Sequence, residues 1–288
     1  MSYFGPVFFT WQRTHSKYLV TTGYDNSLNI FDRHGEKQDQ INLPGLCTGL
    51  AWNNDGEHIG IITDRSPIII LWDASLRKTS RVDTGVRDIL SIILWSKKAA
   101  IVAVGTSKGN VLIYDHTTAR KIPILGKHTK RICSGAWSEN NLLALVGEER
   151  VLSINSEEGD TICEINIKGE ASLLKFVTMK MDDKQQSQIE NCVALVLNKR
   201  SLLLVNINDN ENVHPLNFDE HYGTIVDYFA YQDGYVMIGF TNGLFILISA
   251  NIKNLGNELK QFQVFKESIQ HFAVGKGNKK IAVCNDNV

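Results

Sequence analysis

The stretch WSKKAAIVAVGTSKGNVLIYDHTTARKIPILGKHTKRICSGAW, from Trp95 to Trp137, contains one complete period of a repeat that runs along the chain. Four tryptophans mark the period at intervals of 41, 43 and 42 residues: Trp11, Trp52, Trp95 and Trp137. A second series of polar residues closes short apolar runs, at Asp32, Asp73, Asp115, Asn155, Asn206 and Ser249. Two independent markers therefore share a period of about 42 residues.

The order of elements within each period is also constant. A strand ends near the tryptophan, a polar turn follows, and then comes an apolar run such as YLVTT (18–22), IVAVG (101–105) or LLALVG (142–147). Short runs rich in Val, Ile and Leu, bounded by Gly and Asn, are typical of β-strands, and no helical periodicity is sustained. Residues that tolerate positive φ or form Asx turns account for the tight turns, at Asp25, Asn26, Gly109, Asn110 and Asn242.

Four strands in about forty residues are typical of one blade of a β-propeller. The sequence predicts an all-β fold, a WD40-type seven-bladed β-propeller with an incomplete seventh blade, as a single domain over 1–288. The predicted blades cover about 6–43, 47–85, 90–125, 132–167, 171–218, 224–264 and, in part, 269–288. A charged, glutamine-rich insert in the fifth blade, MKMDDKQQSQIEN (179–191), is predicted to be a solvated loop.

The dipeptide that gives WD repeats their name is intact at Trp72-Asp73, with aromatic variants at Phe31-Asp32 and Tyr114-Asp115. We expect the aromatic ring to pack between sheets and the carboxylate to cap the following turn. The expected structural residues are Trp11, Trp52, Trp72, Asp73, Trp95 and Trp137. Ala230 stands where the period would place a tryptophan, which predicts looser packing of the sixth blade.

Charge and cysteine content exclude several classes of protein. With 30 basic and 31 acidic residues the net charge is -1, whereas a dedicated nucleic-acid binder is usually basic. The five cysteines are scattered and form no CxxC pair, which argues against a disulfide framework or a zinc site. The N-terminus has no signal-peptide pattern and no apolar run approaches the length of a membrane span, so we expect a soluble protein outside the secretory pathway.

Motifs of catalysis are not found in the sequence. The stretch GKHT (126–129) has Lys121 where a phosphate-binding loop requires its first glycine, and there is no HExxH or GxSxG. The acidic pairs Glu148-Glu149 and Glu157-Glu158 fall in turns, where solvated surface is the simpler explanation. We therefore predict no catalytic, cofactor or metal site, and no enzymatic activity.

The strongest local signal is electrostatic, since five cations and no acid lie between Arg120 and Arg131. In a propeller, the loop between blades lies at the same face as the turn between the two middle strands, which would add Lys199 and Arg200 of a later blade. The candidate partner-binding residues are Lys108, Lys121, Lys127, His128, Lys130, Arg131 and Arg150. Such a face could hold an acidic peptide, a phosphoinositide headgroup or an acidic domain. The alternatives are a solvated surface and, for His128, a structural hydrogen bond.

The 29-residue run VGTSKGNVLIYDHTTARKIPILGKHTKRI (104–132), with FDRHGEK, INLPG, EEGDTI, MKMDD and MIGF, resembles the N-terminal propeller of the intraflagellar transport protein 144 family, also called the WD-repeat protein 19 family. The resemblance extends from about Pro6 to the last residue. It implies a subunit of intraflagellar transport complex A, active in retrograde ciliary transport and in the import of membrane proteins. The implied partners are the other subunits, a tubby-like adaptor and receptor cargo, at the cilium or flagellum, the ciliary base and the cytoplasm.

Members of this family carry a second propeller and a helical-repeat region, so the chain resembles a piece of such a protein. We expect the two-stranded last blade to expose a sheet edge, which would leave the ring imperfectly closed or promote self-association. Three functions remain open. They are a scaffold and cargo adaptor, a general reader of peptides or phosphoinositides, and an enzyme of the central channel, for which the required acids or metal ligands are not found.

Overall fold

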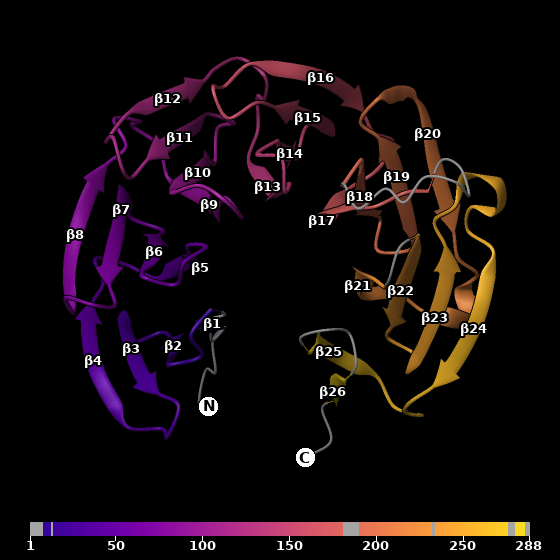
Figure 1. The fold of residues 1–288 in the computed structure, drawn as a ribbon, viewed down its shortest axis with the longest axis horizontal. Helices are drawn as coiled ribbons and strands as arrows, with labels where there is room; N and C mark the ends of the chain where they lie inside the picture. The colour runs from indigo at the N-terminus through magenta and orange to yellow at the C-terminus, as the bar shows by residue number, and fades with distance from the viewer. Residues whose placement is uncertain (1–7, 13, 181–189, 232–233, 276–279, 286–288) are drawn as a thin grey trace. The chain divides into compact units, whose positions relative to one another are not determined.

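β-Strands make up nearly all of the regular structure, in antiparallel four-stranded sheets whose strands follow one another in chain order (Figure 1). The computed structural model describes residues 8–12, 14–180, 190–231, 234–275 and 280–285. By its internal contacts the chain divides into two units, Met1–Glu164 and Ile165–Val288.

Four sheets are formed within the described part of the first unit, the last of them ending just past its boundary. Their strands are β1 (Phe8–Trp11), β2 (Tyr18–Thr22), β3 (Ser27–Asp32) and β4 (Lys37–Asn42); β5 (Cys47–Trp52), β6 (His58–Thr63), β7 (Ser66–Asp73) and β8 (Lys78–Asp83); β9 (Leu90–Trp95), β10 (Ile101–Thr106), β11 (Val111–Asp115) and β12 (Lys121–Ile124); β13 (Ile132–Trp137), β14 (Leu143–Gly147), β15 (Val151–Asn155) and β16 (Thr161–Asn166).

The described part of the second unit contains two four-stranded sheets, one two-stranded sheet and two short 3-10 helices. Its elements are β17 (Ala171–Val177), β18 (Cys192–Leu197), β19 (Ser201–Asn206) and β20 (Asp209–Asn217); η1 (Glu220–Tyr222); β21 (Ile225–Ala230), β22 (Tyr235–Phe240), β23 (Leu244–Ser249) and β24 (Glu258–Gln263), with η2 (Ile252–Asn254) between the last two; and β25 (Ile269–Val274) with β26 (Ile281–Asn285).

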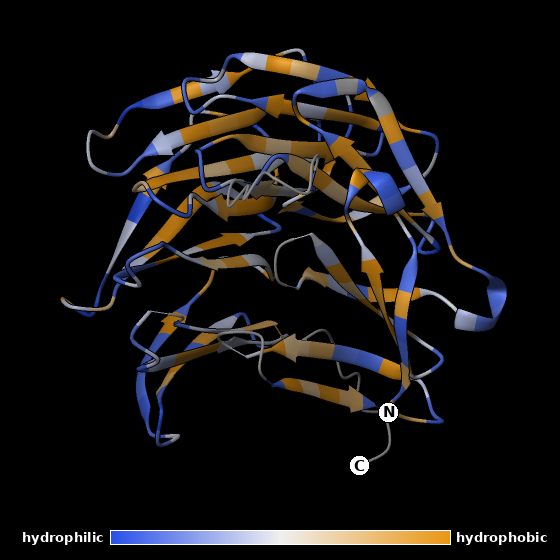
Figure 2. Ribbon diagram, turned by 45° about the vertical axis from the view of Figure 1, so that its right-hand side comes forward, coloured by the Kyte–Doolittle hydropathy of each residue, from blue (hydrophilic) through white to orange (hydrophobic). Residues whose placement is uncertain are grey.

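Neighbouring sheets of the first unit pack face to face, and strand periodicity explains how. On β7, Ile70 and Trp72 join the apolar cluster shared with the sheet β1–β4, whereas Ile69 and Leu71 join the cluster shared with the sheet β9–β12. Successive side chains of a strand point to opposite faces, so an uninterrupted apolar run serves a sheet that is covered on both sides. Figure 2 shows this as hydrophobic colour along the middle strands and hydrophilic colour in the loops.

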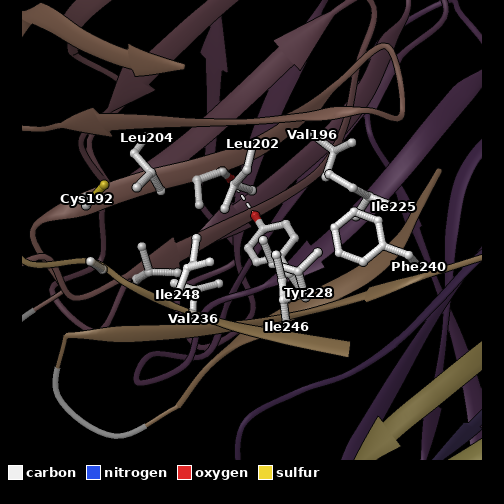
Figure 3. Packing of buried hydrophobic residues seen from close by; sticks show 14 of the residues in the cluster. Cys192, Val196, Leu202, Leu204, Ile225, Tyr228, Val236, Phe240, Ile246 and Ile248 are labelled. Carbon is white, nitrogen blue, oxygen red and sulfur yellow. Dashed lines mark hydrogen bonds between the residues drawn. The ribbon is translucent and has the colours of Figure 1, made fainter. Parts of the chain in front are cut away.

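The core of the second unit lies between the sheets β17–β20 and β21–β24 (Figure 3). Tyr228 is fully buried there, and its hydroxyl donates to the main-chain oxygens of Leu173 and Ala194, each at 2.7 Å. Ala230, two residues later, ends β21 and is exposed. The fully buried aromatic side chain of this strand is therefore Tyr228, while the looser packing expected from Ala230 stays a prediction.

The all-β prediction is confirmed, and the sequence markers fall at strand ends. Each of the four tryptophans that mark the period ends the first strand of a sheet, and each of the six polar markers ends a third strand. Two of the predicted turn residues have positive φ, Asn26 at 53° and Gly109 at 86°. Of the predicted loop 179–191, residues 181–189 lie outside the described part of the chain.

The turn between the two middle strands lies beside the segment that leads into the first strand of the same sheet. The amide of Asp64 donates to the oxygen of Leu46 at 2.9 Å, and the amide of Glu148 donates to the oxygen of Arg131 at 2.9 Å. In the second unit, Asn198 makes the same bond to Glu170 at 2.8 Å. Both kinds of loop therefore gather at one end of each sheet, and this arrangement positions the candidate site.

Candidate partner-binding site

Two turns flank the segment that joins β12 to β13 and carries most of the predicted cations. A Cβ atom added to Gly109, in the β10–β11 turn, would lie 2.5 Å from the oxygen of His128, so the two backbones are in close contact. On the other side, the β14–β15 turn is tied to Arg131 through the amide of Glu148. Five predicted cations are thereby brought to one end of the sheets β9–β12 and β13–β16: Lys108, Lys127, Lys130, Arg131 and Arg150. We call this set the basic loop surface.

His128 lies beneath this surface and does not form part of it. Its side chain is fully buried, with Nδ1 bonded to the carboxylate of Glu149 and Nε2 2.8 Å from Ser153 Oγ. The other carboxylate oxygen of Glu149 accepts from the amide of Lys130 at 3.2 Å. Ser153 Oγ also accepts from Asn155 Nδ2 at 3.0 Å. The histidine therefore holds the segment between β12 and β13 against the β14–β15 turn and against β15. Its buried ring is not accessible to a partner.

The cations of the basic loop surface differ in how much of their charge is already compensated. Lys127 Nζ lies 2.7 Å from Glu164 Oε1, and both side chains are about two-fifths exposed. For the other four, Lys108, Lys130, Arg131 and Arg150, no ion pair is found among the described residues, and all four are exposed. Within the described chain these four cations thus make no close ion pair, although carboxylates lie nearby. The effect of burial on the Asp88 carboxylate is outweighed by hydrogen bonds and by the nearby charge of Lys108, which lower its pKa, and Glu148 shares a turn with Arg150.

The structure does not bring Lys121 to this surface. Lys121 begins β12 opposite Tyr114, whereas Ile124, at the other end of the strand, lies opposite Val111 beside the β10–β11 turn. Lys121 and its neighbour Arg120 are thus at the far end of the sheet. Closeness in the chain predicts that Lys121 and Lys127 share a surface. Strand β12 separates them, however, and because a strand is extended, residues at its two ends lie at opposite ends of the sheet. Lys199 and Arg200 belong to the second unit, where Arg200 pairs with Glu220 at 2.8 Å.

Four of the five tryptophans pack into or against the apolar clusters of the first unit. Trp72 is fully buried, contacts Tyr18 and Trp52 edge to face, and donates from Nε1 to Asp39 Oδ2 at 2.9 Å. Trp95 and Trp137 are also buried. Trp11 is 45% exposed and belongs to none of the apolar clusters found among the described residues of the first unit, so its structural role stays a prediction.

The carboxylate of the repeat dipeptide caps the turn that follows it, as the sequence predicts. Asp73 Oδ1 accepts from the amides of Ser75 and Leu76, each at 2.8 Å. Asp115 does the same for Thr117 and Thr118, at 2.8 and 3.2 Å. These aspartates therefore hold local turns.

A second group of cations, which the sequence pattern does not single out, lines a groove between the outer strands β4 and β8. The groove has a volume of about 540 Å³ and is lined by Asp39, Gln40, Ile41, Asn42, Ile70, Arg77, Lys78, Thr79 and Arg81. Its basic residues come from the short run RKTSR (77–81), in which two neutral residues separate the adjacent pair Arg77 and Lys78 from Arg81. The only signal available from sequence was the excess of cations over acids between residues 77 and 81.

Two properties of the part of the chain that the structure describes bear on chemistry, the placement of metal-ligating side chains and the ionisation of the cysteines. No three His, Cys, Asp or Glu side chains in that part of the chain are placed to hold a metal ion. Burial raises the pKa of the Cys47 thiol to about 11 and that of Cys192 to about 12, which keeps both protonated and poorly nucleophilic. No helix among the described residues is long and apolar enough to span a membrane.

Comparison with known proteins places the chain in a family. The family model described as WDR19 first beta-propeller matches residues 7–288. The chain is 46% identical over 282 residues to WD repeat-containing protein 19 of Homo sapiens, and the match covers 98% of this chain and 21% of that protein. It is 27% identical over 287 residues to WD repeat-containing protein dyf-2 of Caenorhabditis elegans, covering 99% of this chain and 20% of that protein.

The mouse WD repeat-containing protein 19 gives a similar result, with 44% identity over 98% of this chain. The chain thus spans about a fifth of the length of these relatives. The matched residues include the six four-stranded sheets and the two-stranded sheet of the described chain. These sheets repeat with the period that the tryptophans mark. The chain belongs to the WDR19 first beta-propeller family.

Proposed function

We propose that this chain is a non-enzymatic interaction scaffold and cargo adaptor, the first propeller of a subunit of intraflagellar transport complex A. The observation that carries the proposal is the 46% identity to WD repeat-containing protein 19 over nearly the whole chain. In this proposal the protein works in retrograde ciliary transport and in the import of membrane proteins. It acts at the cilium or flagellum, the ciliary base and the cytoplasm. Its partners are the other subunits, a tubby-like adaptor and receptor cargo.

The proposal treats residues 1–288 as one domain, in which each four-stranded sheet is a blade and β25 with β26 begins a seventh. Two features support the assignment of each four-stranded sheet as a blade. The sheets β5–β8 and β9–β12 are covered with apolar side chains on both faces, as a blade between two blades must be. Each also presents its loops at its two ends, which leaves the loops as the variable surface for partners.

The test uses the full-length protein that contains this propeller, expressed in ciliated cells that lack their own copy. Deletion of 1–288 is expected to abolish ciliary entry of a membrane receptor, and affinity purification of the isolated chain is expected to recover complex A subunits. Normal receptor entry without the propeller, together with a purification that recovers no complex A subunit, would show the scaffold proposal to be wrong.

A second candidate function is a reader of acidic peptides or phosphoinositides, and the basic loop surface favours it. Four of its five cations have no ion-pair partner among the described residues, and an exposed cation contributes about 1 kcal/mol near an anionic membrane. Phosphatidylcholine vesicles with and without phosphatidylinositol bisphosphate are a suitable probe. Changing Lys130→Ala and Arg131→Ala together is expected to weaken binding about 30-fold.

The matched control for this experiment is the pair Arg120→Ala and Lys121→Ala, which removes the same charge from the far end of the sheet. If both double variants lose binding equally, the attraction is due to overall charge and the surface is not a reader. If neither double variant changes complex A recovery in cells, while only the first loses lipid, the two functions are separate.

A further inference from the structure

The groove between β4 and β8 carries more positive charge than its own residues neutralise. Arg77, Lys78 and Arg81 line it, and the sole carboxylate among its lining residues is Asp39. That carboxylate already accepts a hydrogen bond from Trp72 Nε1 at 2.9 Å. Arg77 donates to the neutral Gln38 Oε1 at 3.2 Å, and no ion pair of the three cations is found among the described residues. Charge complementarity therefore favours an anionic occupant of this groove.

The direction of the side chains on β8 shows which of these cations face the groove. Val82 packs against the apolar cluster that the sheet β5–β8 shares with the sheet β9–β12. Because side chains alternate along a strand, Thr79 and Arg81 point the other way, toward β4. Arg81 is exposed, so its guanidinium is available to a ligand.

The floor of the groove is apolar. Ile70, on the adjoining strand β7, is 5% exposed, and Ile41 of β4 packs partly buried against the same cluster. Both belong to the interface between the sheets β1–β4 and β5–β8. A ligand that enters the groove can therefore bury one aliphatic side chain on this floor while its charges meet the cations above.

The shape of the groove favours an extended chain over a flat membrane. Its walls, β4 and β8, are the outer strands of their sheets and are paired on one side only, so each has unpaired backbone groups (Figure 1). The volume of about 540 Å³ lies within the range of ligand-binding clefts, roughly 300–1,000 Å³. Extended peptides commonly bind beside sheet edges, where the main chain supplies hydrogen bonds and alternate side chains supply specificity.

We propose that the groove between β4 and β8 binds an acidic, extended peptide segment of a partner protein. Carboxylates of the segment pair with Arg77 and Arg81, and an aliphatic side chain between them lies on Ile41 and Ile70. This site is formed by the outer strands of the first two sheets and shares no residue with the basic loop surface. It goes beyond the proposed scaffold function by naming a second docking place and the chemistry of the segment that fills it.

The test measures fluorescence polarisation of a labelled peptide, Gly-Ser-Glu-Glu-Leu-Glu-Glu-Ser-Gly, titrated with the 288-residue chain. The double variant Arg77→Ala with Arg81→Ala is expected to bind at least tenfold more weakly, since each arginine loses a charge-assisted hydrogen bond. The control Arg120→Ala with Lys121→Ala is expected to bind as the unchanged chain does. Replacing the four glutamates of the probe by glutamines, or its leucine by glycine, is expected to weaken binding as well.

A variant with reversed charge guards against a folding defect. Arg77→Glu with Arg81→Glu is expected to lose the acidic probe and to gain affinity for the same peptide with lysines in place of glutamates. The proposal is overturned if the alanine variant binds the acidic probe unchanged, or if the glutamine probe binds as well as the glutamate probe. Two other anionic ligands are tested as competitors: vesicles containing phosphatidylinositol bisphosphate, and single-stranded RNA. The proposal is also overturned if either competitor displaces the peptide from the unchanged chain and, on the alanine variant, binds more weakly than the peptide does.

Discussion

The hydroxyl of Tyr228 on β21 lies 2.7 Å from the main-chain oxygen of Ala194 on β18, and this bond joins two neighbouring sheets through their common core (Figure 3). The ring is fully buried, and burial holds the pKa of the hydroxyl well above its usual value, so it stays a donor at any physiological pH. The same hydroxyl reaches the oxygen of Leu173, also at 2.7 Å. The single proton of this hydroxyl is thus shared between two main-chain oxygens, and the bond to Ala194 is buried.

Replacing this side chain with Tyr228→Phe is expected to lower the free energy of unfolding by about 1–3 kcal/mol, because the main-chain oxygens of Leu173 and Ala194 lose this donor. Urea unfolding followed by circular dichroism measures the change. Tyr231→Phe is the matched control, since the described residues offer its hydroxyl no hydrogen bond, and its effect is expected to stay within about 0.5 kcal/mol. Equal effects of the two changes would contradict a special role for Tyr228.

Substitutions at His128 and at Lys130 are expected to affect different properties, the first stability and the second binding. Changing His128→Ala leaves Glu149 and Ser153 without their buried partner, and we expect a loss of about 2–4 kcal/mol of unfolding free energy. Lys130→Ala, two residues away on the surface, is expected to change stability by less than about 0.5 kcal/mol and to weaken vesicle binding instead. Thermal unfolding and vesicle sedimentation of both variants provide the comparison, and a stable His128→Ala chain would contradict it.

Gly109 is required for two reasons that can be measured apart. Its φ is 86°, and an added Cβ would lie 2.5 Å from the oxygen of His128. Gly126 has a similar φ of 74° but open space around it. Gly126→Ala is therefore expected to cost about 1 kcal/mol of unfolding free energy from backbone strain alone, and Gly109→Ala about 1–3 kcal/mol more from the clash. Equal melting temperatures of the two variants would show that the backbone around His128 can shift to accommodate the added Cβ atom at little cost.

Acidification is expected to destabilise the first unit through His116. Its ring lies 4.5 Å from that of His58, measured between centroids. Burial and the positive charge of a protonated His58 hold the pKa of His116 below its usual value, although Asp115, Asp55 and Asp73 oppose the shift. A histidine that binds its proton more weakly when folded favours the folded state fully above its unfolded pKa, near 6.5, and loses this contribution as the pH falls.

The melting temperature is therefore expected to fall between about pH 7.5 and pH 5.5, and His116→Gln is expected to flatten this dependence. His34→Gln, at an exposed histidine, is the control and should leave the slope unchanged. Carboxylates such as Asp25, whose pKa is lowered by hydrogen bonds from Ser27, titrate below this window and do not interfere. A slope that persists in His116→Gln would assign the dependence to other groups.

The charge of Asp39 is expected to lower the affinity of the groove between β4 and β8 for an acidic peptide. Asp39→Asn keeps an oxygen that can accept from Trp72 Nε1 but removes the one negative charge among the lining residues. We expect affinity for the acidic probe peptide to rise about two- to fivefold, the range of an exposed charge pair. Asp83→Asn, on β8 but outside the lining, is the control, and an equal rise in both variants would assign the effect to overall charge.

The residues that mark the repeat already determine the strands and turns of this protein. A strand depends on alternation within five or six neighbours, and a turn on whether a residue such as Asn26 or Gly109 tolerates positive φ, so both can be predicted locally. The cap at Asp73 could be foreseen for the same reason, because it reaches only two or three residues ahead.

Which side chains meet was decided by tertiary structure, because it depends on how sheets pack and which end of a strand a residue occupies. Lys121 and Lys127 are six residues apart but lie at opposite ends of a sheet, whereas Arg77 and Asp39 are far apart in the chain and line one groove. His128 is buried by Glu149 and Ser153, which come from a later hairpin. Contacts of this kind follow from packing between distant segments, which no local pattern encodes.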